Sequence, residues 1–354
     1  MSFLYLPWSF APIDPATGAI PKSILYVGAS STVAGSQDFL WDSATNRMQI
    51  GKVSLSGAGI EFGVGGSVKL IQEATGVATI DIVGTRYLRL GLIGGVIGSE
   101  MGANSGGGAS QALAAGAMAL GGSYASGTNS FAAAIANNTV TYGARSLGAI
   151  AMGDRNQATF GNATSVGGQL STAGGGASFV SGSGCSTGFN SFGSVALGNG
   201  AANTVAGKFS FAGTYYSSTF GTSQMGMICL SNTTPGAAAT VLTSTGGAAS
   251  TINQLILPDN TAHAFSGIVV ARQKSTGGTA SAAWSVSGLI RREAGAGTTT
   301  LIASTVTVIS NVPGWTLALS ADTVNGGLSV TATGAAATDI RWHVKLDSSE
   351  VTYT

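Results

Sequence analysis

A short sequence unit recurs at a nearly constant interval between residues 109 and 213, and it restricts the folds open to this chain. Clear copies are Ala-Met-Ala-Leu-Gly at 117–121, Ala-Ile-Ala-Met-Gly at 149–153 and Ser-Val-Ala-Leu-Gly at 194–198. The units end at Gly121, Asn137, Gly153, Gly168, Gly182, Gly198 and Gly213, in steps of 14 to 16 residues. This step is too short for a helix pair and suits two short strands with two turns. The repeat therefore predicts a β-solenoid.

Side chains alternate within each unit, with larger apolar residues on one face and alanines on the other. A roll this narrow buries little apolar area per chain. The core of a single chain therefore offsets only a small part of the conformational entropy lost on folding. We therefore expect an obligate homotrimer. The larger residues are expected to form the core of the repeat and of the trimer: Met118, Leu120, Ile150, Met152, Val195 and Leu197.

Charge is scarce, which restricts the classes of partner. Only 8% of the residues are charged and the net charge is +1, so the clustered basic surface of a nucleic-acid-binding protein is not expected. No window holds the roughly 18 apolar residues of a membrane span, so no membrane insertion is expected. The N-terminus lacks the basic start of a signal peptide. Cys185 and Cys229 show no metal or disulfide spacing, and both are expected to be buried.

The first 25 residues combine four prolines with several aromatic residues, which disfavours regular structure. One interpretation is a loose leader. The favoured interpretation, since exposed aromatic side chains are a liability, is a segment that docks on a partner protein. Its expected anchors are Phe3, Tyr5, Leu6, Trp8 and Phe10.

Two stretches resemble known families. The run Asp-Phe-Leu-Trp-Asp at 38–42, followed by Asn-Arg-Met-Gln-Ile-Gly at 46–51, resembles a segment near the front of tail-fibre proteins of tailed bacteriophages. The phrase Ser-Val-Ala-Leu-Gly-Asn-Gly-Ala at 194–201 is similar to the head repeat of trimeric autotransporter adhesins. That second resemblance implies a left-handed parallel β-roll built from three chains, and it brings no catalytic residue with it.

Turn signals predict five regions: a docking segment at 1–25, a short-strand shaft at 26–100, the β-roll at 101–214, a connector at 215–238 and a C-terminal domain at 239–354. The strands and turn signals of the last region predict a β-sandwich of the jelly-roll type. Three sequence phrases in this region resemble a terminal domain of phage fibres. The whole chain is thus expected to be all-β. The strands expected in the last region are 239–245, 252–257, 265–273, 282–291, 298–309, 315–320, 328–333 and 339–346.

No group of residues suggests catalysis. Glycoside cleavage needs two carboxylates that flank one bond, and the repeat holds only Asp154. In a trimer, three copies of Asp154 could meet on the threefold axis and form an ion site. No serine motif accompanies His263 or His343, and no metal-ligand cluster is visible. No enzyme activity, metal or cofactor is therefore expected. The remaining carboxylates are expected to be turn formers or solvated charges: Asp259, Glu293, Asp322, Asp339, Asp347 and Glu350.

The favoured hypothesis is a non-enzymatic phage fibre on the outside of the tail or capsid, which attaches to another virion protein by its N-terminus and binds a host-surface glycan or protein through its distal domain. The alternatives are a structural decoration without a receptor role, a cell-surface trimeric adhesin and an enzymatic tailspike. For Trp284, Trp315 and Trp342, the favoured interpretation is that they form the core of the sandwich. The candidate receptor contacts are Arg272, Lys274, Trp315, Asp322 and Asn325.

Overall fold

The computed structural model describes the strands up to Met101 by their backbone, and residues 112–120, 122–133, 141–216, 219–273 and 278–353 with their side chains. The chain divides into two compact units, Met1–Gly59 and Ile60–Thr354. The regular elements described are strands and one 3-10 helix, η1 (Ala296–Thr298), which confirms the all-β class. Among the described residues, no helix is long and apolar enough to cross a membrane.

The first unit contains two antiparallel hairpins. Strand β1 (Leu25–Val27) pairs with β2 (Val33–Gly35), and β3 (Phe39–Asp42) pairs with β4 (Arg47–Ile50). The second hairpin lies in the stretch that resembles phage fibres. The five predicted docking residues between Phe3 and Phe10 lie outside the described residues.

The second unit begins with an antiparallel meander in which each strand pairs with the next. Its last strand also pairs in parallel with the first strand of the solenoid's larger sheet, so one ladder of hydrogen bonds continues into the repeat. The meander strands are β5 (Ile60–Phe62), β6 (Val68–Ala74), β7 (Val77–Ile82), β8 (Thr85–Ile93) and β9 (Val96–Met101).

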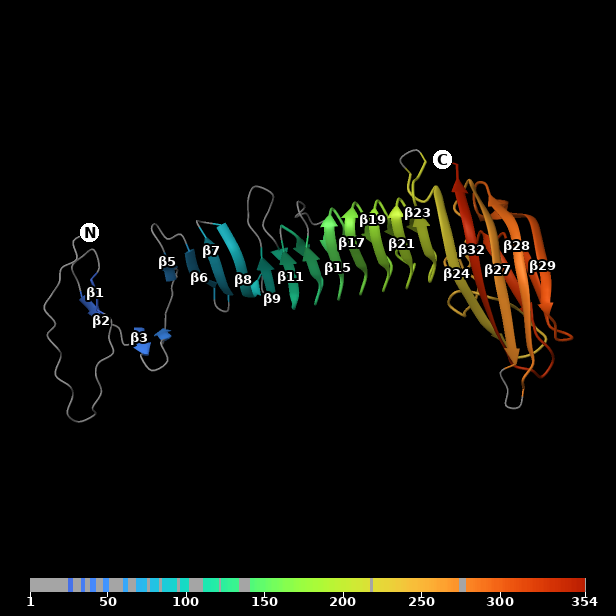
Figure 1. The fold of residues 1–354 in the computed structure, drawn as a ribbon, viewed down its shortest axis with the longest axis horizontal. Coiled ribbons are helices and arrows are strands. Elements are labelled where there is room, and N and C mark those ends of the chain that lie inside the picture. Colours follow the sequence, from blue (N-terminus) through green and yellow to red (C-terminus); the bar gives the residue numbers. More distant parts are fainter. Residues whose placement is uncertain are drawn as a thin grey trace. The chain divides into compact units, whose positions relative to one another are not determined.

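The repeat forms a solenoid with two parallel sheets, which confirms the predicted architecture (Figure 1). We call the sheet with the longer strands the outer-row sheet. Its strands are β11 (Ala117–Leu120), β13 (Phe131–Ala133), β15 (Ile150–Asp154), β17 (Thr164–Gln169), β19 (Phe179–Ser183), β21 (Val195–Asn199) and β23 (Phe209–Ala212). The second sheet contains β10 (Gln111–Ala112), β12 (Tyr124–Ala125), β14 (Gly143–Ala144), β16 (Gln157–Ala158), β18 (Thr172–Ala173), β20 (Ser186–Thr187) and β22 (Ala202–Asn203).

Small side chains fill the interior of the solenoid and set its register. The ladder stacks one buried residue per rung: Ala119, Ala132, Ala151, Ser165, Val180, Ala196 and Ser210. Three predicted units are therefore shifted, because aligning them on their last residues would have put Ile135, Val166 and Phe211 at inward positions. The observed rungs instead place Ala132, Ser165 and Ser210 inside, since the interior has room only for small groups.

Two sheets form the C-terminal part of the chain. The larger is antiparallel in the order β29 (Thr300–Ser310), β28 (Ser281–Arg292), β27 (Thr261–Gln273), β32 (Ile340–Thr352) and β24 (Ser223–Thr234). The smaller places β31 (Gly327–Thr333) beside β25 (Ala239–Val241), β26 (Leu255–Ile256) and β30 (Thr316–Asp322). All eight predicted strands are present, and the jelly-roll type stays a prediction. Strand β24 was not predicted and lies in the region expected to be a connector. Its sequence contains Met-Gly-Met and is a weak strand signal.

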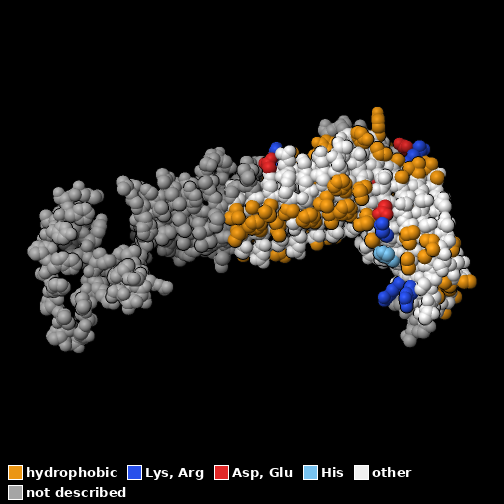
Figure 2. Space-filling model, viewed as in Figure 1, with side chains coloured by type: hydrophobic (Ala, Val, Ile, Leu, Met, Phe, Trp, Pro, Cys, Tyr) orange, Lys and Arg blue, Asp and Glu red, His pale blue; other side chains and the backbone are white. Residues whose placement is uncertain are grey.

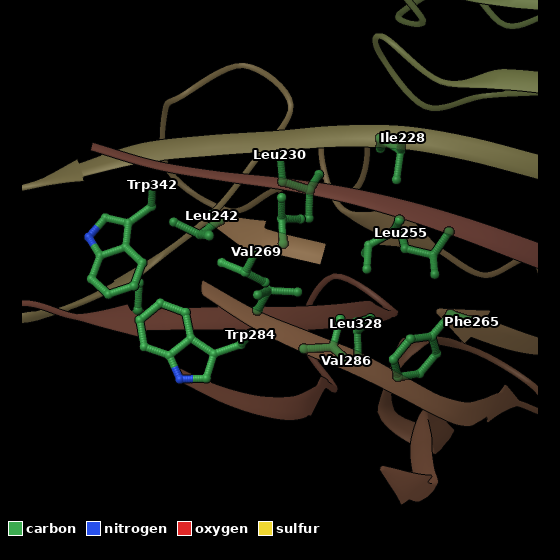
Figure 3. Packing of buried hydrophobic residues seen from close by; sticks show 14 of the residues in the cluster. Ile228, Leu230, Leu242, Leu255, Phe265, Val269, Trp284, Val286, Leu328 and Trp342 are labelled. Carbon is green, nitrogen blue, oxygen red and sulfur yellow. The ribbon is translucent and has the colours of Figure 1, made fainter. Parts of the chain in front are cut away.

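Buried side chains from both sheets share one hydrophobic core (Figure 3). Trp284 and Trp342 stack with ring centroids 5.5 Å apart, and Trp315 lies 5.9 Å from Trp342. The indole nitrogen of Trp342 donates a 2.9 Å hydrogen bond to the hydroxyl of Thr234. This confirms the interpretation of the three tryptophans as core residues.

Candidate functional site at the solenoid junction

A buried ion pair connects the last solenoid rung to the C-terminal sheet. Lys208 stands directly before β23, and its Nζ lies 2.6 Å from Oε1 and 2.8 Å from Oε2 of Glu350 on β32. The two side chains are only 4% and 3% exposed. The sequence places these residues 142 positions apart, so only the folded chain brings them together.

Two neutral side chains complete the surroundings of this carboxylate. Gln224 on β24 donates from Nε2 to Glu350 Oε2 at 2.7 Å, and its amide also exchanges two 2.9 Å hydrogen bonds with the backbone of Ala202. The hydroxyl of Ser348 donates to Glu350 Oε1 at 2.5 Å. Glu350 therefore receives donors from the solenoid corner, β24 and its own strand.

These contacts keep Glu350 ionised. Burial by itself would raise the pKa of the carboxyl group, but the positive charge of Lys208, the interaction with His263 and the hydrogen bonds from Lys208 and Ser348 together outweigh this effect. The net result lowers the pKa of Glu350 to about 2. A carboxylate with so low a pKa is a weak proton acceptor, which suits a fixed counter-charge better than a general base.

His263 on β27 lies beside this pair without a hydrogen-bond partner. Its Nε2 is 3.8 Å from Glu350 Oε2, and neither ring nitrogen forms a hydrogen bond. Burial lowers the pKa of His263 to about 4; Glu350 opposes the shift and Lys208 adds to it. The imidazole is thus neutral at pH 7, with one N–H donor and one nitrogen acceptor unused.

A cavity of about 230 Å³ opens beside these groups. Its polar lining includes Lys208, Gln224, His263, Glu350 and Asp259, and the ring of Phe220 lies at the same cavity. Asp259 is half exposed, pairs with Arg292 Nε at 2.7 Å and accepts a 2.9 Å hydrogen bond from a backbone N–H. Both carboxylates of the cavity thus already have a cationic partner.

The expectation that Glu350 is a turn former or a solvated charge is wrong, because the strand period buries it. Inward positions of β32 recur every second residue, from Trp342 through Val344, Leu346 and Ser348 to Glu350. The same alternation turns His263 inward on β27, in phase with Phe265. Following the period of two to the strand ends would have identified both residues from the sequence.

A second feature is an apolar surface on the outside of the outer-row sheet, visible as an orange band in Figure 2. The six residues predicted as repeat core lie here, exposed or half-buried; Met118 and Met152 are 43% and 41% exposed. They are therefore not the core of the single chain, because the interior accepts only small side chains. We call this surface the outer rows: Met118, Phe131, Ile150, Thr164, Phe179, Val195, Phe209 and Met227 in one, and Leu120, Ala133, Met152, Val166, Ser181, Leu197, Phe211 and Met225 in the other.

The predicted receptor contacts do not come together as one surface. Trp315 is 4% exposed and belongs to the core, so it is not available to a receptor. Asn325 Nδ2 donates a 2.8 Å hydrogen bond to Asp322 Oδ2 across a turn. Partial burial would raise the pKa of Asp322, but hydrogen bonds from this turn outweigh it, so the pKa is lowered. Arg272 is exposed on β27, and Lys274 lies outside the described residues.

Other predicted single residues have ordinary surroundings. Asp154 pairs with the adjacent Arg155 at 3.1 Å. Cys185 is buried as expected, and burial raises the pKa of its thiol. The expectation that Cys229 is buried is wrong, because this residue occupies an outward position of β24 and is exposed. Among the described residues, no three His, Cys, Asp or Glu side chains are grouped to hold a metal ion.

No protein-family model and no curated protein matches the sequence. Among solved structures, one similar chain is the tailspike protein gp49 of Acinetobacter baumannii bacteriophage Fri1, described as a capsular polysaccharide depolymerase; it has 11% identity and a TM-score of 0.21, over 62% of this chain and 44% of that one. Another is the tailspike protein of Acinetobacter baumannii phage AM24, with 10% identity and a TM-score of 0.19, over 63% of this chain and 52% of that one.

The chain thus spans about half the length of these tailspikes. The expectation that the chain is not an enzyme is contradicted by this comparison and is withdrawn, because the first neighbour is described as a depolymerase, which is an enzyme. At these TM-scores the likeness transfers neither an activity nor a site.

Proposed function

We propose that this chain is a phage tail-fibre-like protein of the virion exterior, which binds a polysaccharide on the host surface through its C-terminal region. The observation that carries the proposal is a nearly uncharged parallel solenoid that continues, through β23 and β24, into the two C-terminal sheets. Such an arrangement suits a spacer that presents a binding domain. The hairpin β3–β4, in the stretch that resembles phage fibres, supports attachment to a virion protein through the preceding segment.

The proposal includes a homotrimer held together by the outer rows. A lone chain would leave in water two largely apolar rows, in which Thr164 and Ser181 are the polar members, and exposed apolar patches of this kind mark interaction surfaces. The occupant that fits is another copy of the same chain, because it offers the same rows at the same strand spacing and no charge interrupts them. The rows continue onto β24 at Met225 and Met227, so the trimer contact extends to the start of the C-terminal sheet.

A charge in the outer rows should abolish the trimer. We expect Leu197→Asp to give a species of one chain mass, 34.8 kDa, in sedimentation velocity, whereas the natural chain has three times that mass. The reason is the cost of burying an unpaired carboxylate in an apolar contact. Thr172→Asp, at an outward position of the second solenoid sheet, is the matched control and should remain trimeric. A monodisperse natural monomer, or a trimer of Leu197→Asp, contradicts the proposal.

Binding to polysaccharide tests the function itself. The labelled full chain should bind encapsulated bacteria saturably, lose that binding on capsule-free mutants of the same strains, and be competed off by the purified capsule. Size-exclusion chromatography of the capsule after incubation measures whether the bound polymer is shortened. Equal binding to encapsulated and capsule-free cells would refute polysaccharide recognition.

A further inference from the structure

We propose that the junction cavity beside Glu350 and His263 holds one uncharged sugar residue; this rests on the proposed binding of polysaccharide. The starting observation is His263, a buried polar side chain that lines the cavity and has no hydrogen-bond partner at either nitrogen. Leaving a buried donor and acceptor unsatisfied costs free energy, so a ligand hydroxyl that reaches one of the two nitrogens removes part of that cost.

The charges of the cavity favour a neutral ligand. Glu350 is paired with Lys208 at 2.6 Å, and Asp259 with Arg292 at 2.7 Å. No cation or anion is left without a partner among these four groups, so an ionic ligand would gain no counter-charge while losing its hydration. A neutral ligand avoids that cost.

The hydrogen-bonding groups specify hydroxyls. A neutral imidazole offers one donor and one acceptor, and a hydroxyl group both donates and accepts, so a hydroxyl of the ligand can pair with either ring nitrogen of His263. The half-exposed carboxylate of Asp259 adds an acceptor at the same cavity. The ring of Phe220, which is 39% exposed, supplies an apolar surface for the C–H face of a sugar.

The size of the cavity limits the ligand to one ring. Its volume of about 230 Å³ is below the range of roughly 300–1,000 Å³ that drug-sized ligands occupy. It equals the space of about eight water molecules at roughly 30 Å³ each. A single monosaccharide unit, either free or at the end of a chain, suits that space.

Titration of the full chain with free monosaccharides tests the site directly. Isothermal titration calorimetry with glucose, galactose, N-acetylglucosamine, N-acetylgalactosamine and rhamnose should show binding of at least one, and glucuronic acid should bind more weakly. His263→Leu should raise the Kd about tenfold, as expected for lost hydrogen bonds. His263→Gln keeps a donor and an acceptor and should change the Kd by less than about threefold. His343→Leu, at an exposed position of β32, is the matched control and should leave the Kd unchanged.

Two results overturn the inference: no heat of binding with any neutral sugar, or a Kd of His263→Leu equal to that of the natural chain. Thermal unfolding of each variant shows that it is folded. If His263→Leu still binds encapsulated cells while no free sugar binds, the cavity fails as a sugar site and the proposed function stands. If the natural chain fails to bind cells but binds a free sugar at His263, the proposed function fails separately.

Discussion

Glu350→Gln should lower the free energy of unfolding by about 3–5 kcal/mol, the range measured when one partner of a buried ion pair is removed. The substitution keeps the shape of the side chain but leaves the ammonium of Lys208 buried without a counter-charge. It also replaces one of two acceptor oxygens with a donor group, although Oε2 now accepts hydrogen bonds from Lys208 and Gln224, and Oε1 accepts one from Ser348. Urea unfolding at fixed chain concentration measures the loss.

The matched control is Glu293→Gln, at an ion pair with Arg291 in which both side chains are more than half exposed. Exposed pairs of this kind contribute about 0–1 kcal/mol, so little change is expected. The double variant Lys208→Met with Glu350→Gln removes the stranded charge and should be more stable than Glu350→Gln alone. A Glu350→Gln chain as stable as Glu293→Gln would show that the junction does not depend on the ion pair.

Much of the fold could be predicted because the sequence repeats its physical constraints. The alternation of Met118 with Ala119, or Val195 with Ala196, is a period of two, and its return every 14 to 16 residues predicts stacked rungs. The register was harder to predict. Glycine marks the turns, but the ladder is aligned by the small residue that must point inward, and Ser210 rather than Phe211 takes that place.

The candidate site was missed because its members come from separate elements. Lys208, Gln224, His263 and Glu350 lie in the solenoid corner, β24, β27 and β32, and no local motif relates them. A second signal was the position of Lys208. It is one of few charged residues in the solenoid, and it directly precedes β23, where no turn requires a solvated side chain. Its partner could not be named without the pairing of β24 with β32.

The same cluster makes stability depend on pH through His263. Its pKa in the folded chain is about 4, below the ordinary 6.5, because the ring is buried and lies close to Lys208. Glu350, 3.8 Å away, opposes this shift, and Asp259 lines the same cavity. Between these values the unfolded chain takes up a proton that the folded chain does not. Stability is therefore complete above pH 6.5 and falls as the pH decreases toward 4. The whole gap corresponds to about 3 kcal/mol.

Glu350 acts with the same sign at lower pH. Its pKa of about 2 in the folded chain lies below the ordinary 4.5, so the stability it contributes is present above pH 4.5 and is lost as the pH falls toward 2. The two residues thus produce consecutive acid transitions, the upper from His263 and the lower from Glu350. Replacing one residue should remove one transition and leave the other.

His263→Leu should therefore flatten the upper part of the pH profile. Between pH 7 and pH 5 the natural chain should lose about 2 kcal/mol that the variant keeps, because leucine takes up no proton in either state. The exposed His343→Leu is the control and should follow the natural profile. Urea unfolding at pH 7, 6, 5 and 4, at fixed chain concentration, measures the three curves. If His263→Leu loses as much stability as the natural chain between pH 7 and 5, the acid sensitivity lies elsewhere and His263 does not remain neutral in the folded chain.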